Sequence, residues 1–138
     1  MSRKPGLPDR RPDSEKITIN VGFVDLGQID LLVQDGFYAN RTDLIRTAIR
    51  NQLARHEDAV NSSSVRNRLE YGLVRYDRAA LEAVAAAGET LQIKVLGLAT
   101  IADDVDPALA RRTIASIEVL GAFHASPAIK AALADRLR

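Results

Sequence analysis

The chain has 138 residues, no cysteine and a formal net charge of +1. The absence of cysteine excludes disulfides and thiolate metal sites, and nothing argues for an oxidising compartment. No apolar run approaches the length of a membrane span, and the N-terminus lacks the apolar core of a signal peptide. We therefore expect a cytoplasmic protein with no membrane partner.

Residues 1–14 predict a flexible arm, because they contain three prolines and one glycine and show no hydrophobic periodicity. The arm has several basic side chains, which can follow a phosphate backbone or enter a minor groove. A solvated tail is an equally simple interpretation, and the sequence leaves both open. The possible arm contacts are Arg3, Lys4, Arg10 and Arg11.

Residues 16–23 alternate between polar or glycine positions and apolar positions, which predicts a β-strand. One face carries Ile17, Ile19, Val21 and Phe23, and the other carries Lys16, Thr18, Asn20 and Gly22. Alternation with β-branched residues is typical of a strand that is buried on one face and exposed on the other.

Two amphipathic helices are predicted after this strand. The first ends at Gly36, a residue type that commonly terminates helices, and its apolar positions are Val24, Leu26, Ile29, Leu32 and Val33. Asn40 occupies the position of an N-cap for the second helix. The apolar stripe of that second helix consists of Leu44, Ile45, Ala48, Ile49 and Leu53.

This strand–helix–helix unit is too small to bury its own apolar faces, and a lone strand leaves both edges unpaired. The simplest remedy is a twofold partner, whose strand pairs antiparallel with this one and whose helices interlock with these. The sequence therefore predicts an intertwined homodimer.

The order of these elements resembles a ribbon-helix-helix domain of the MetJ/Arc/CopG kind. An alternating strand is followed by a helix that ends in glycine, and then by a polar cap with arginine, Asn40-Arg41-Thr42-Asp43-Leu44-Ile45-Arg46. The resemblance covers residues 15 to about 57, under a third of the chain. Its specificity lies in the order and spacing of these features, since no single residue is diagnostic.

The resemblance implies double-stranded DNA as the partner, with a two-stranded ribbon in the major groove. On this interpretation the base-reading side chains are Lys16, Thr18 and Asn20. The start of the second helix would bind phosphate through Asn40, Arg41 and Thr42, because free N–H groups and the helix dipole favour an anion there. The structural alternative is that the strand face is merely solvated and Asn40 only a cap.

Net charge gives this interpretation no support. Residues 1–58 carry equal numbers of basic and acidic side chains, whereas nucleic-acid binders usually show a basic excess. Any DNA binding must therefore depend on the local arrangement of side chains.

The C-terminal half repeats itself. Ile93-Lys94-Val95-Leu96-Gly97 recurs 24 positions later as Ile117-Glu118-Val119-Leu120-Gly121, and each copy is followed by a cap and proline that predict a helix, Asp106-Pro107 and Ser126-Pro127. A fainter copy spans residues 71–76 before an alanine-rich helix at 79–87. We interpret these repeats as a solenoid-like stack of about three strand–helix units, forming a small parallel sheet with helices on one side. A single α/β lobe is the alternative.

No motif in the chain indicates an enzyme, a cofactor or a metal. Asp103, Asp104 and Asp106 cluster before a predicted helix, where capping and the helix dipole explain them better than a calcium loop. Neither histidine has a nucleophile or a second histidine arranged with it, and no phosphate-binding glycine motif is present.

The sequence thus predicts an α+β protein with three parts: a basic, proline-rich arm at 1–14, a ribbon-helix-helix domain at 15–60, and a repeat-like α/β domain at 65–138, with a soft boundary near residues 61–64. We predict a homodimeric transcriptional regulator whose C-terminal module assembles tetramers or larger species or binds a partner. The alternatives are an antitoxin, a structural assembly protein that never touches DNA, and a small-molecule sensor.

Overall fold

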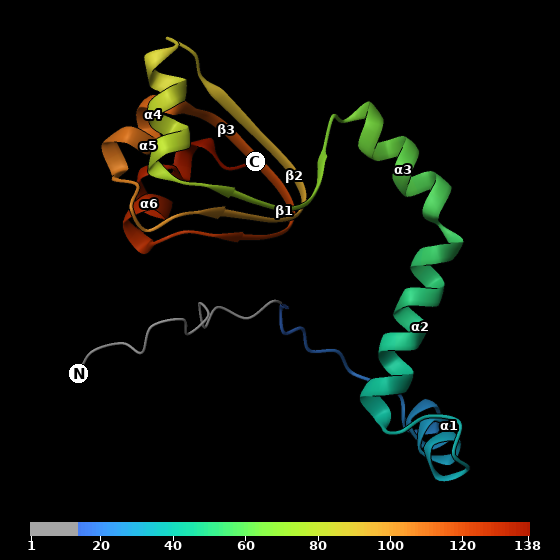
Figure 1. The fold of residues 1–138 in the computed structure, drawn as a ribbon. Helices are drawn as coiled ribbons and strands as arrows, with labels where there is room; N and C mark the ends of the chain where they lie inside the picture. Colours follow the sequence, from blue (N-terminus) through green and yellow to red (C-terminus); the bar gives the residue numbers. More distant parts are fainter. Residues whose placement is uncertain (1–13) are drawn as a thin grey trace, which may run out of the picture. The chain divides into compact units, whose positions relative to one another are not determined.

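A computed structural model describes residues 14–138, an α+β chain with two compact units that divide after Leu53. The N-terminal unit contains an irregular segment at residues 15–22, helix α1 (Phe23–Gln34) and most of helix α2 (Arg41–Arg55). The C-terminal unit contains helix α3 (Glu57–Arg66) and all of the β-structure (Figure 1).

The irregular segment at residues 15–22 forms no strand in the single chain, although its alternation of polar and apolar residues predicts one. A strand exists only when its backbone groups pair with a neighbour, and no strand among residues 14–138 pairs with this segment. Phe23 begins α1, so its assignment to the strand face was wrong. The alternating run therefore ends at Gly22.

Helix α1 ends as its sequence predicts. Gly36 has a φ of 85°, its N–H donates to the carbonyl of Val33 at 3.1 Å, and the N–H of Phe37 donates to the carbonyl of Leu32 at 3.0 Å. These two bonds form a Schellman motif, which requires a left-handed residue that glycine adopts without strain.

Helix α3 follows α2 after a break at His56, and it includes the serine run of residues 62–64. The boundary that we predicted near residues 61–64 thus lies inside a helix, whereas the two compact units divide earlier, after Leu53. Ser64 is the one buried residue of α3, and its hydroxyl donates to the carbonyl of Asn61 at 2.9 Å. This bond gives the hydroxyl of the buried Ser64 a hydrogen-bond partner within the helix.

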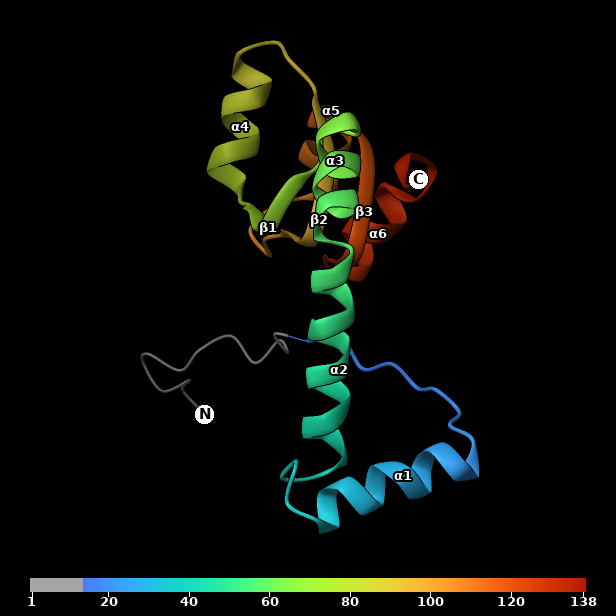
Figure 2. The same ribbon diagram turned by 90° about the vertical axis from the view of Figure 1, so that its right-hand side faces the viewer.

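Three strand–helix units make up the rest of the C-terminal unit. They are β1 (Glu70–Tyr76) with α4 (Arg78–Ala86), β2 (Leu91–Ile101) with α5 (Pro107–Thr113), and β3 (Ile114–His124) with α6 (Pro127–Ala132), followed by a 3-10 turn, η1 (Ala134–Arg136). The strands are parallel in the order β1-β2-β3 (Figure 2). The predicted strands, helices and parallel sheet are confirmed, and α4, α5 and α6 gather on one side of the strands (Figure 1).

The repeat is in register across the sheet, with Gly72 opposite Gly97 and Gly97 opposite Gly121. All three glycines have a positive φ, at 110°, 137° and 124°. A Cβ at Gly97 would lie 2.2 Å from the carbonyl oxygen of Gly72, and one at Gly121 would lie 2.1 Å from that of Gly97. Only glycine permits this backbone conformation and this close approach.

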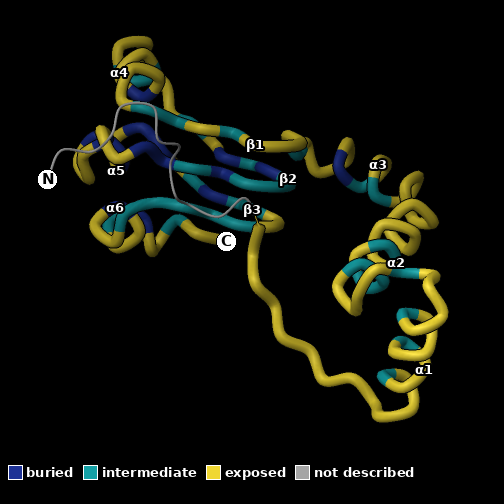
Figure 3. Tube along the Cα trace, turned by 60° about the horizontal axis from the view of Figure 1, so that its bottom comes forward, coloured by how far each residue is buried: buried dark blue, intermediate teal, exposed yellow. Residues whose placement is uncertain are grey.

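The core of the C-terminal unit lies between the strands and these helices. Alternate residues of β2 are buried in it, and α4, α5 and α6 contribute its other side (Figure 3). Its fully buried large side chains include Leu81, Ile93, Ile101, Ile114, Ile117, Ile129 and Leu133. The periodicity of two along β2 therefore separates a core face from an outer face.

Local capping explains where the three helices of the repeat begin. The Asp77 carboxylate accepts from the N–H of Ala80 at 2.9 Å, Asp106 accepts from Leu109 at 2.7 Å, and the Ser126 hydroxyl accepts from Ile129 at 3.3 Å. The predicted caps at Asp106 and Ser126 are confirmed, and a cap satisfies N–H groups that the helix itself leaves unpaired.

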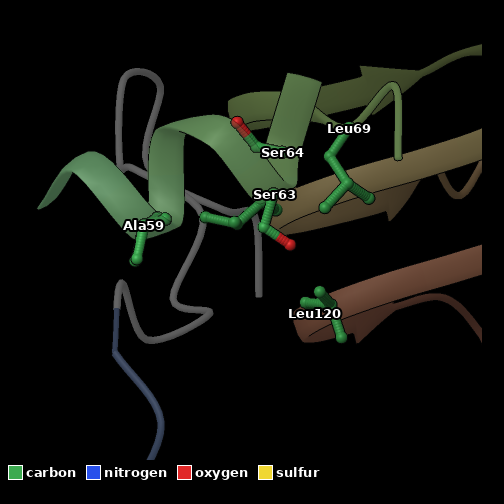
Figure 4. Close-up of a pocket in the computed structure, with 7 residues that line it drawn as sticks. Ala59, Ser63, Ser64, Leu69 and Leu120 are labelled. Atoms are coloured by element: carbon green, nitrogen blue, oxygen red, sulfur yellow. The ribbon is translucent and has the colours of Figure 1, made fainter. Parts of the chain in front are cut away.

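A cavity of about 270 Å³ separates α3 from the outer face of the sheet (Figure 4). Its lining is mainly apolar and consists of Ala59, Val60, Ser63, Ser64, Leu69, Leu96 and Leu120.

Candidate nucleic-acid interface

The side chains predicted to read bases lie on the irregular segment before α1. Lys16, Thr18 and Asn20 are all exposed. The opposite face of the same segment is exposed as well: Ile17 is 74% and Ile19 is 65% accessible. The polar side chains are thus available to a ligand, whereas the face that we expected to be buried is not covered within the single chain.

The same holds for the two helices of the N-terminal unit, in which no residue is buried (Figure 3). Leu26, Ile29 and Val33 of α1 are only partly buried, and Phe23 is 93% accessible. A soluble domain rarely exposes this much contiguous apolar surface, so such a surface marks an interaction site. Sequence reasoning placed Phe23 on a strand face and did not identify it as an exposed side chain at the start of a helix.

The start of α2 has the geometry of a capped helix. The Asn40 side-chain oxygen accepts from the N–H of Asp43 at 2.8 Å, and the Asp43 carboxylate accepts from the N–H of Ala39 at 3.0 Å. The predicted N-cap at Asn40 is therefore present. Helix geometry leaves the N–H groups of the next two residues, Arg41 and Thr42, without an intrahelical acceptor, and such groups favour an anion.

Arg41 has a partner that the sequence did not suggest. Its Nε and Nη2 donate to the two carboxylate oxygens of Asp30 on α1 at 2.7 and 2.9 Å. This bidentate hydrogen bond lowers the pKa of Asp30 and raises that of Arg41. Both side chains are about half exposed. The remaining guanidinium N–H groups of Arg41 stay available to a phosphate, because arginine has five donors.

Nothing in the sequence identified this ion pair, because the two residues lie eleven positions apart on different helices. The predicted arm contacts Arg3, Lys4, Arg10 and Arg11 lie outside the described residues.

Among residues 14–138, no cluster of three or more acidic, histidine or cysteine side chains is placed to hold a metal ion. The acidic group before α5 has structural roles: Asp106 caps that helix, and Asp104 accepts from the N–H of Arg78 at 3.1 Å. No helix in the described part of the chain is both long and apolar enough to cross a membrane.

Comparison with known proteins decides the family. The chain matches the model of the Ribbon-Helix-Helix transcriptional regulator family over residues 12–130. The chain belongs to this family. Its members are regulators of transcription, typically without enzymatic activity, and membership implies DNA binding. The match extends well beyond residues 15–57, into the strand–helix repeats. No curated protein and no solved structure matches the chain.

Proposed function

We propose that the protein is a homodimeric, sequence-specific repressor or activator that reads the major groove with a two-stranded antiparallel ribbon. Residues 15–22 of each chain form one strand of that ribbon, and Lys16, Thr18 and Asn20 contact base edges. Lysine suits the acceptors of guanine, asparagine can bond adenine through two atoms, and threonine offers a hydroxyl or a methyl contact. We infer that such a regulator acts in the cytoplasm.

The observation that carries this proposal is the uncovered apolar surface of the N-terminal unit. Both its alternating segment and its two helices lack a buried residue, although they carry apolar stripes. Pairing the segment with its own copy would satisfy its backbone groups, cover Ile17 and Ile19, and leave the polar face outward. Family membership supports the same arrangement.

Asn40, Arg41 and Thr42 hold the DNA backbone in this proposal. The unpaired N–H groups at the start of α2 and the positive end of its dipole attract a phosphate oxygen. Arg41 uses two of its donors on Asp30, and its remaining donors contact the phosphate in this proposal. Arm residues Arg3, Lys4, Arg10 and Arg11 add contacts to flanking DNA.

The C-terminal unit serves as a module for oligomerisation or partner binding. Its continuous core and capped helices favour a folded module over the short, disordered toxin-binding segment that an antitoxin would carry. In this proposal the three strand–helix units of the module stack on one another as in a solenoid.

A genomic selection tests the proposal. Purified protein is mixed with fragmented DNA of its own genome, and bound fragments are sequenced at moderate salt. We expect a short palindromic or directly repeated motif, whose half-site spacing reports how dimers lie along DNA. Recovery of nothing above background would refute sequence-specific binding and favour an assembly protein.

A further inference from the structure

The outer edge of β1 is open. Within residues 14–138, β1 pairs only with β2, at one edge of the three-stranded sheet. The carbonyl of Gly72 faces Gly97 on β2, and the backbone groups of successive residues alternate between the two sides of a strand. The N–H and C=O groups of Leu73 and Arg75 therefore point away from β2. An unpaired edge of this kind is a template for another strand.

The start of the opposite edge of the sheet is covered by the chain itself. Ile117 of β3 forms a bridge with Leu137, and its carbonyl accepts from the N–H of Arg138 at 2.8 Å. Arg136 adds a bond from its guanidinium to the carbonyl of Ile114 at 2.6 Å. The tail therefore covers only the start of the β3 edge, whereas no strand among residues 14–138 covers the outer edge of β1. Pairing of β1 with the rest of β3 would grow an open-ended sheet. Two open β1 edges can instead meet about a twofold axis, which closes the assembly.

The side chains of β1 suit a second copy of the same strand. Leu73 is 81% accessible, more than expected for an apolar residue of a strand unless another surface covers it. The positive φ of Gly72 interrupts the strand, so the regular segment open to pairing is Leu73–Tyr76.

One antiparallel register fits this segment. Centring the twofold axis on Leu73 would require pairing across Gly72, and centring it on Arg75 would oppose two guanidinium groups. Centring it on Val74 places each Leu73 opposite the partner's Arg75, whose aliphatic stem can cover it. In that register the outward N–H and C=O groups of Leu73 and Arg75 bond across the axis.

We propose that β1 pairs antiparallel with β1 of a second copy of this chain, centred on Val74, so that two three-stranded sheets become continuous. About four backbone hydrogen bonds form across the axis. This inference deepens the oligomerisation role proposed above and rests on it. Dimerised N-terminal units, or neighbouring dimers on one DNA, bring second copies together at effective concentrations of about millimolar, at which a short interface suffices.

Cysteine scanning tests the register, because the natural chain has no cysteine. Across this axis the two Val74 residues form a pair without hydrogen bonds, with Cα atoms about 4.5 Å apart, within the range of a disulfide. Val74→Cys should therefore cross-link rapidly under mild oxidation, and Leu73→Cys and Arg75→Cys more slowly. Val65→Cys is the control, because Val65 is 76% accessible but lies on α3. Cross-linking of folded Val74→Cys no faster than the control would overturn the proposal.

Leu73→Lys gives a second test, whose sedimentation readout needs no substitution at the half-buried Val74. Each new ammonium group would lie opposite the partner's Arg75 guanidinium, so sedimentation at high concentration should lose any species larger than a dimer, or cross-linking of Val74→Cys should slow by about tenfold or more. Val65→Lys should change neither, and circular dichroism checks that both variants fold. Unchanged assembly of Leu73→Lys would also overturn the proposal.

The genomic selection separates the two levels of inference. A chain that selects a DNA motif but shows no preferential cross-linking at β1 retains the proposed function and loses this interface. A chain that cross-links at Val74 but selects no motif retains the interface and loses DNA recognition.

Discussion

The row of glycines across the sheet allows a quantitative test of the repeat, through Gly97→Ala. The φ of Gly97 is 137°, a region that costs a non-glycine residue about 1–3 kcal/mol. An alanine Cβ would also lie 2.2 Å from the backbone oxygen of Gly72, and backbone cannot move aside as a flexible side chain can. Relieving that contact displaces β1 and adds about 1–3 kcal/mol, as overpacking a core does.

Gly72→Ala is the matched control. Gly72 has a similar φ of 110°, yet a Cβ there meets nothing within 4 Å. Both substitutions incur conformational strain, and only Gly97→Ala incurs the collision. We therefore expect Gly97→Ala to destabilise the C-terminal unit by about 2 kcal/mol more than Gly72→Ala, the middle of the range for overpacking.

Thermal unfolding followed by far-ultraviolet circular dichroism measures this difference. For a domain of this size, each kcal/mol shifts Tm by about 4–8 °C, so the two variants should differ by about 8–16 °C. Gly121→Ala should behave like Gly97→Ala, because its Cβ would lie 2.1 Å from the carbonyl oxygen of Gly97. Equal losses for Gly72→Ala and Gly97→Ala would refute the argument that close strand approach requires glycine in this row.

Four further predictions concern single side chains. Because pairing with Arg41 lowers the pKa of the Asp30 carboxylate, this ion pair should stabilise the N-terminal unit at pH values above the unfolded pKa of about 3.9. The stabilisation should be lost as the pH falls further, and an acid titration of Asp30→Asn should lack that loss of stability. Arg41→Ala should weaken binding to all DNA sequences and reduce the salt slope by about 1 per chain, whereas Asp30→Asn, which breaks the same ion pair, should retain the slope. Asn20→Ala should relax base preference by about 1–3 kcal/mol at one position, measured by competition between operator variants. Asp106→Ala should cost about 1 kcal/mol in urea unfolding through loss of the α5 cap, and unchanged stability would contradict that role.

The N-terminal unit shows why the sequence predicted helices better than the strand. Helix ends depend on residues within a few positions of each other, as the Schellman motif at Gly36 and the cap at Asn40 demonstrate. The run at residues 15–22 needs a partner strand that the single chain does not contain, so its alternation alone could not produce a strand. The proposed base contacts of Lys16, Thr18 and Asn20 depend on that partner and stay a prediction.

By itself the sequence determined the local elements and the repeat of this protein. Capping residues, prolines and the alternation of apolar residues act over short distances, so they predicted β2, β3 and the starts of α5 and α6. Only the tertiary structure decided which groups meet. It paired Arg41 with Asp30, and it aligned three glycines, two of which have no room for a Cβ. It also covered the start of the β3 edge with Leu137 and left the β1 edge open. These contacts join residues far apart in the chain, and no local preference specifies them, because they depend on where whole elements pack.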